Sequence, residues 1–166
     1  AGYQHFDTRM GMICTPETFT PLPTVDGVQV SQINKQSHVQ LAQDFLLVQT
    51  KGFIPESDID SIAPEQAQRF LKNLEGQAYL AYLNEQPVCA GKYARIEKGI
   101  SDLGGLATLP EHRGRGIATY LTGYIVSQLF EQNVESVYLT AANAEAGRIY
   151  QRVGFLPKLT YVIYGQ

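Results

Sequence analysis

Three strand-like segments follow one another in the middle of the chain, and the last of them runs into a glycine-rich turn that opens a helix. These segments cover residues 78–83, 88–96 and 100–108, with short turns between them. Strands joined by short turns pair antiparallel, so this stretch predicts a meander. Gly104 and Gly105 weaken the third strand unless its backbone bulges there. Apolar residues at helical spacing on both sides of the meander predict helices that pack on this sheet, which is an α/β fold.

The length of the chain, 166 residues, leaves room for one globular domain and a short extension. Pro16, Pro21 and Pro23 lie among threonines near the N-terminus, where no hydrophobic period is sustained. We therefore expect residues 1–24 to be an N-terminal extension or linker. The domain itself is expected to comprise residues 25–166.

Acidic residues slightly outnumber basic ones, since 16 Asp and Glu against 13 Lys and Arg give a formal net charge of -3. This balance argues against a protein that binds nucleic acid or anionic lipid through its overall field. No apolar run approaches the length of a membrane span and no signal peptide is visible, so we expect a cytoplasmic protein. Cys14 and Cys89 have neither a CxxC spacing nor histidine-rich neighbours, so buried thiols and no metal site are expected.

A turn rich in glycine and arginine, Arg113-Gly114-Arg115-Gly116, separates the third strand from the next helix. Small residues at a helix N-terminus let successive backbone N–H groups turn inward together, and the helix dipole adds about half a positive charge. Such a turn binds phosphate oxygens; the alternative is a loop with solvated arginines. It lacks the Gly-Lys-Ser/Thr ending of P-loop NTPases and the third glycine of a dinucleotide fingerprint, so another phosphate ligand is expected.

Two motifs in this part of the chain resemble those of the GNAT superfamily of N-acetyltransferases. The loop that binds the acetyl-CoA pyrophosphate in that superfamily is similar to Arg113-x-x-Gly116-x-Ala118, preceded here by Thr108-x-Pro110-Glu111. The signature that follows the next strand is similar to Asn143-x-x-Ala146-x-x-x-Tyr150-x-x-x-Gly154-Phe155. Thr108 stands where an aliphatic residue is usual, and Ala118 replaces the commoner glycine.

This resemblance implies a GNAT fold, in which a mixed, mainly antiparallel twisted sheet of six or seven strands is flanked by about four helices and two strands splay apart at the cofactor cleft. It also implies acetyl-CoA as co-substrate and no metal. The strand before the loop would pair with the pantetheine arm, and the loop amides would wrap the pyrophosphate. The residues implied in cofactor binding are Leu106, Ala107, Thr108, Arg113, Gly114, Arg115, Gly116, Ile117, Ala118 and Asn143.

The activity that the resemblance implies is transfer of an acetyl group from acetyl-CoA to an amine by direct nucleophilic attack. An amine with a pKa of ~10.4 is almost wholly protonated at pH 7, so it needs a base, a water relay or a desolvated site. Asp102 is the candidate base, because it lies six residues before Thr108, where protein-acetylating relatives place a catalytic Glu; a solvated Asp is the alternative. Tyr150 is the candidate donor to the leaving thiolate, with a core aromatic as the alternative.

The acceptor has no motif of its own, and small-molecule amines and protein amines are both candidates. Four acids lie in the region that lines the acceptor site in relatives, where they would attract a cationic amine or form a solvated loop; they are Glu56, Asp58, Asp60 and Glu65. A non-catalytic module that binds acyl-CoA for regulation or interaction is the alternative function. Relatives often dimerise through their C-terminal strands, which makes a homodimer one expected assembly.

Overall fold

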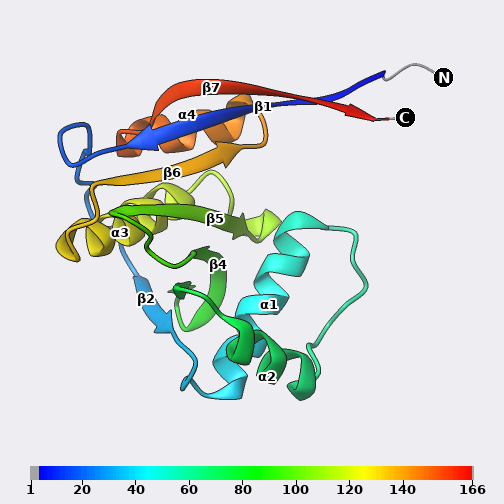
Figure 1. Ribbon diagram of the computed structural model, residues 1–166. Coiled ribbons are helices and arrows are strands. Elements are labelled where there is room, and N and C mark those ends of the chain that lie inside the picture. Colours follow the sequence, from blue (N-terminus) through cyan, green and yellow to red (C-terminus); the bar gives the residue numbers. More distant parts are fainter. Residues whose placement is uncertain (1–3, 166) are drawn as a thin grey trace.

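The computed structural model describes residues 4–165, which build one mixed sheet of seven strands (Figure 1). The strands lie in the order β2-β3-β4-β5-β6-β1-β7. Within these residues only β5 and β6 pair in parallel, and the other neighbours are antiparallel. This confirms the predicted fold class. The strands are β1 (Gln4–Cys14), β2 (Val28–Ile33), β3 (Gln77–Leu83), β4 (Gln86–Tyr93), β5 (Ile100–Thr108), β6 (Ser136–Ala141) and β7 (Leu156–Gly165).

Within the described residues, four α-helices cover the two faces of the sheet. They are α1 (Val39–Phe53), α2 (Pro64–Asn73), α3 (Ile117–Glu131) and α4 (Ala144–Val153). Successive residues of β3 point to opposite faces, as a strand requires. Leu80 is buried with Phe45 of α1 and Leu71 of α2, whereas Tyr79 is buried with Leu121 of α3. The sheet is thus packed on both sides, with α1 and α2 opposite α3 and α4.

Local sequence signals mark the start of α2 and both ends of α4. Pro64 is the first residue of α2. Asn143 caps α4, because its Oδ1 accepts a hydrogen bond from the Ala146 amide at 2.9 Å. Gly154 ends that helix with a left-handed φ of 105°. At α1 the cap is His38.

The N-terminal residues differ from the expected extension. Gln4–Cys14 form β1, which lies between β6 and β7 and pairs antiparallel with both. Met12 and Cys14 are fully buried in the core on the α3 and α4 side. The expected boundary at residue 24 therefore falls between two strands of a single sheet. Alternating Met10, Met12 and Cys14 are the sequence signal for this strand.

The strand β7 lies at the edge of the sheet and pairs with β1. Gln4 is paired with Gly165, and the start of β1 and the end of β7 lie side by side (Figure 1). Among the helices of residues 4–165, none combines the length and apolar character that crossing a membrane requires.

Candidate functional site

The strand β5 separates from β6 partway along its length. The two strands pair only from Ile100 opposite Ser136 to Asp102 opposite Tyr138. β5 nevertheless continues to Thr108, where it is still paired with β4. The β6 side of β5 beyond Asp102 therefore has no strand partner among the described residues. An extended ligand can pair with such an edge.

A bulge redirects β5 just after the separation. Its register with β4 shifts between the pairs Lys92–Gly104 and Ala90–Ala107, which gives β5 an extra residue. Gly105 lies in the bulge with a φ of 62°, in the left-handed region that favours glycine. The Gln49 side chain of α1 donates a hydrogen bond from Nε2 to the Gly105 carbonyl at 2.6 Å. This is the bulge that the glycine pair predicts.

The turn before α3 presents a continuous run of free backbone amides. None of the N–H groups of residues 114–119 has an acceptor within residues 4–165, and pairing resumes where the Tyr120 amide donates to the Gly116 carbonyl at 2.9 Å. Gly114 and Gly116 have φ values of 74° and 77°. No atom lies within 4 Å of the position that a Cβ would take at either residue. Free amides, open space and the positive end of a helix are the features by which a helix N-terminus can bind an anion.

Arg113 is held differently from the residues that follow it. Its amide donates to the Pro110 carbonyl at 3.2 Å, so it is not one of the free amides of the loop. Its side chain turns back, with Nε 3.2 Å from the Thr108 carbonyl and Nη2 2.7 Å from the Gly52 carbonyl. Arg113 thereby ties the loop to the ends of β5 and α1. Arg115 is exposed and makes no side-chain hydrogen bond or ion pair within residues 4–165.

Asn143 lies two residues beyond the end of β6, the strand from which β5 separates. Its Oδ1 is used to cap α4. Its Nδ2 has no hydrogen-bond partner among the described residues, which leaves both of its N–H donors available to a ligand.

Tyr150 of α4 belongs to the core on the α3 and α4 side, close to the end of β5. Its ring packs edge-on against Phe155, with centroids 6.0 Å apart. Burial, with a smaller contribution from the neighbouring Cys89, raises the pKa of Tyr150 to about 12. Cys89 lies opposite Thr108 and accepts a hydrogen bond from its Oγ1 at 3.2 Å. The same hydrogen bond gives a reason for a threonine where relatives carry an aliphatic residue.

The Cys89 thiol is fully buried, and burial raises its pKa to about 12. A thiol nucleophile must be deprotonated and accessible. Cys89 is therefore an inert part of the core.

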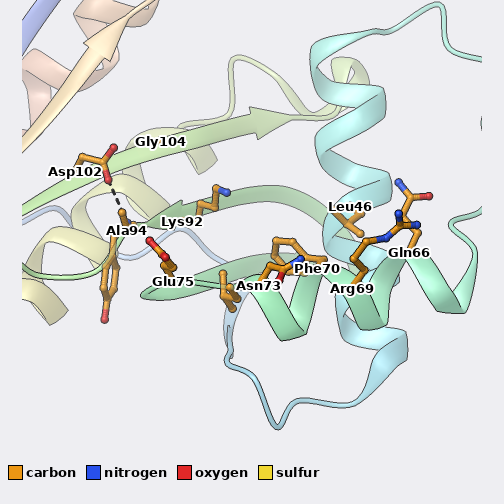
Figure 2. A pocket seen from close by; sticks show the side chains of 12 residues that line it. Leu46, Gln66, Arg69, Phe70, Asn73, Glu75, Lys92, Ala94, Asp102 and Gly104 are labelled. Atoms are coloured by element: carbon orange, nitrogen blue, oxygen red, sulfur yellow. Dashed lines mark hydrogen bonds between the residues drawn. The ribbon is translucent and has the colours of Figure 1, made fainter.

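Asp102 faces the opposite side of β5 from Tyr150. It lines a cavity of about 720 Å³ bounded by α1, α2, β4 and β5 (Figure 2). Its Oδ1 accepts a hydrogen bond from the Ala94 amide at 3.2 Å, the dashed line in Figure 2. The two candidate catalytic residues thus lie on opposite faces of the strand that leaves β6.

The acidic segment at residues 56–65 contributes no lining to this cavity. None of its four acids lines it, and Asp60 is paired with Lys51 at 2.9 Å. The charges that face the cavity come instead from α2, from the end of that helix, and from β4 and β5.

A model of the Acetyltransferase (GNAT) family matches residues 42–155, more than half of the chain. The chain belongs to the GNAT family. The matched stretch runs from within α1 to the second residue after α4, and so contains the separated strand, the amide-rich loop and Tyr150. No curated protein matches the sequence.

Solved structures of other GNAT proteins share the fold at low sequence identity. A GCN5-related N-acetyltransferase from Kribbella flavida superposes with a TM-score of 0.73 and 24% identity, over 99% of this chain and 60% of that one. A GCN5-related N-acetyltransferase from Sphaerobacter thermophilus gives 0.72 and 19%, over 98% and 52%. A tandem GNAT protein from the clavulanic acid biosynthesis pathway gives 0.69 and 16%, over 98% and 55%.

The chain thus spans between about half and three fifths of each of these proteins. The strand β1 lies outside the residues that the family model matches. The superposition on the Kribbella flavida structure covers nearly the whole chain and therefore includes it. The GNAT fold of this chain is therefore the whole seven-stranded sheet.

Proposed function

We propose that this GNAT domain transfers an acetyl group from acetyl-CoA to the amine of an acceptor by direct nucleophilic attack. The observation that carries the proposal is the run of free amides at residues 114–119 beside a strand edge that has no partner. A protein with a net charge of -3 needs local donors of this kind to hold a polyanionic ligand.

The residues present fit the parts of acetyl-CoA. Amides of residues 114–118 would hold the pyrophosphate, with the Arg115 side chain as an added cation. The backbone of residues 106–108 would pair with the amide groups of the pantetheine arm, and Asn143 would donate from Nδ2. When bound, acetyl-CoA supplies an activated acyl group in its thioester.

Asp102 is proposed to receive the proton of the attacking amine, directly or through water. It faces the cavity from the strand that carries the bulge, so an amine in the cavity lies beside it. A positioned carboxylate contributes about 10²–10⁴-fold to such a step. The amine would approach the thioester from the α1 and α2 side of β5, and the thiol would leave on the opposite side, where Tyr150 lies.

Tyr150 is proposed to stabilise the leaving thiolate by a hydrogen bond. A thiol has a pKa of ~8.5, whereas the pKa of Tyr150 is raised to about 12. Transfer of the whole proton would therefore cost about 5 kcal/mol. The hydroxyl has no hydrogen-bond partner within residues 4–165, so it is free to donate one without losing its proton.

Calorimetric titration with CoA, followed by measurement of thiol release from acetyl-CoA in the presence of an amine library, tests the proposal. A non-catalytic acyl-CoA module would give heat of binding without thiol release. Buried Cys14 and Cys89 keep the background of the thiol reagent low.

The variant Gly116→Ala tests the loop, because its methyl group would occupy the open space in front of the free amides. We expect CoA affinity to fall about tenfold, the value of one good hydrogen bond. Gly27→Ala is the matched control, since Gly27 has a similar φ of 74° in a turn that contacts no part of the loop. Equal CoA affinity in Gly116→Ala and Gly27→Ala would contradict the assignment of the loop.

A further inference from the structure

The cavity on the α1 and α2 side carries charges of both signs (Figure 2). Glu75 and Asp102 are its acids, and Arg69 and Lys92 are its bases. Its remaining lining includes the apolar side chains of Leu46 and Phe70, which form one wall. The cavity is thus neither an apolar pocket nor a pocket of one charge.

The four charged groups are not paired with one another. Ion pairs among the described residues join Lys51 to Asp60 and Arg95 to Glu97, and none involves a cavity residue. Arg69, Lys92 and Glu75 are exposed, and Asp102 is half-buried. A ligand can therefore pair with these groups without breaking an internal salt bridge, which would otherwise offset the gain.

One of the bases, Arg69, lies away from the two acids along the cavity. Figure 2 shows Asp102 and Glu75 at one end, on either side of Ala94, and Arg69 beside Gln66 of α2 at the other, with Lys92 between them. Gly104 also lines the cavity, one residue before the bulge. Asp102 thus faces the cavity from β5, the strand of the proposed transfer site, whereas Arg69 lies farther along the cavity on α2.

Charge complementarity follows from this order. A cationic amine at the acidic end would meet Asp102 and Glu75, but a second cation farther along the ligand would face Arg69 and Lys92 at a cost. A neutral tail would leave both bases without a partner. A carboxylate or phosphate on the tail would instead form charge-assisted hydrogen bonds with the Arg69 guanidinium.

We propose that the acceptor is a small amine that also carries an anionic group, with its amine at Asp102 and its anion at Arg69. This inference rests on the proposed acetyltransferase function and names its substrate class. Carboxylate and phosphate share the required chemistry, so both are represented among the probes.

Thiol release from acetyl-CoA is measured with matched acceptors that differ only in the anion. The pairs are 4-aminobutyrate with 4-aminobutanamide, and phosphoethanolamine with ethanolamine. We expect kcat/KM to be about tenfold higher for the anionic member of at least one pair, and the pair that responds identifies the anion. Equal kcat/KM within both pairs overturns the proposal.

Arg69→Gln is expected to abolish this preference by raising KM for the anionic acceptor alone. Lys72→Gln is the matched control, because Lys72 is an exposed base on the same helix that does not line the cavity. Loss of the preference in Lys72→Gln as well, or its retention in Arg69→Gln, overturns the assignment of Arg69. Arg69 is exposed and has no ion pair among the described residues, so the variant is expected to fold.

A binding measurement separates failure of this inference from failure of the proposed function. 4-Aminobutyrate and phosphoethanolamine are titrated into protein saturated with CoA, in wild type and in Arg69→Gln. Heat of binding that is lost in the variant supports the acceptor class even where no amine releases thiol, a result that would contradict only the acetyl transfer. Absence of binding to the wild type, together with thiol release from neutral amines, would overturn the acceptor class alone.

Discussion

The Tyr150 hydroxyl can be removed with little change in packing, because the ring alone contacts Phe155. In Tyr150→Phe we expect kcat to fall about 10²-fold, the usual loss of one transition-state donor, with CoA affinity changed less than about twofold. Steady-state kinetics and calorimetry measure the two effects. Tyr161→Phe is the control, since Tyr161 lies on the edge strand β7. An equal loss of turnover and of CoA affinity would contradict a role in the transition state.

Asp102 is tested by its pH–rate profile. Asp102→Asn keeps the shape of the side chain but cannot accept a proton at neutral pH. We expect kcat/KM to fall about 10²-fold or more at pH 7, and the deficit to shrink at higher pH, where more of the amine is already neutral. Asp58→Asn provides the control, because Asp58 is exposed and does not line the cavity. A wild-type profile in Asp102→Asn would leave the base to be found elsewhere.

Sequence reasoning located the glycine-rich turn before α3 but not the contacts that the Arg113 side chain makes. The motif marks Arg113 as the start of the loop, and its spacing says nothing about where the guanidinium points. In the structure this group bonds the carbonyls of Thr108 and Gly52, at the ends of two different elements. Gln49, which holds the bulge, lies outside both motifs for the same reason. Contacts between distant elements leave no local pattern.

At the scale of elements, the bulge in β5 depends on a backbone conformation that other residues resist. In Gly105→Ala the new Cβ would meet the Gln49 side chain, and the left-handed φ would add strain. We expect the free energy of unfolding to fall by about 1–2 kcal/mol and KM for acetyl-CoA to rise. Urea unfolding measures the first change and thiol release the second.

The adjacent glycine provides the control for stability. Gly104 has no atom within 4 Å of its Cβ position and no positive φ, so Gly104→Ala is expected to change the free energy of unfolding by less than about 0.5 kcal/mol. Equal destabilisation by both substitutions would show that the left-handed conformation is not what the strand requires.

The elements that sequence reasoning found are those with local signals. α2 begins at its proline, α4 lies between its asparagine cap and its glycine, and the meander is marked by its turns. In β1 the local signal is weak, because only Met10, Met12 and Cys14 alternate, several polar residues precede them, and both partner strands lie near the other end of the chain. Its place in the sheet is decided by long-range pairing, which single-sequence periodicity does not contain.

At the scale of the whole molecule, the buried Cys89 thiol makes stability fall at alkaline pH. Burial raises its pKa from 9.0 to about 12, so the folded state holds the proton more tightly than the unfolded chain. The corresponding stabilisation is complete below pH 9 and is lost as the pH rises toward 12. We expect a slope of up to about 1.4 kcal/mol per pH unit from this group.

Urea unfolding at pH 8, 9 and 10 measures that slope. Cys89→Ala is expected to be less stable at pH 8, because a buried group and the Thr108 hydrogen bond are lost, and to show a shallower decline. Cys14, whose pKa burial also raises, contributes the same decline in both proteins. Parallel slopes for wild type and variant would exclude Cys89 as the source.

The insertion of β1 between β6 and β7 affects how the molecule assembles. The part of the sheet formed by β6, β1 and β7 cannot be completed by a hairpin of neighbouring segments. β6 and β7 do not pair with each other, and both pair with β1, which lies far from them in the sequence. Closing so long a loop costs entropy before any contact offsets it, and pairings distant in sequence slow folding most. Synthesis must therefore reach β7 before the edge that β1 shares with it can form.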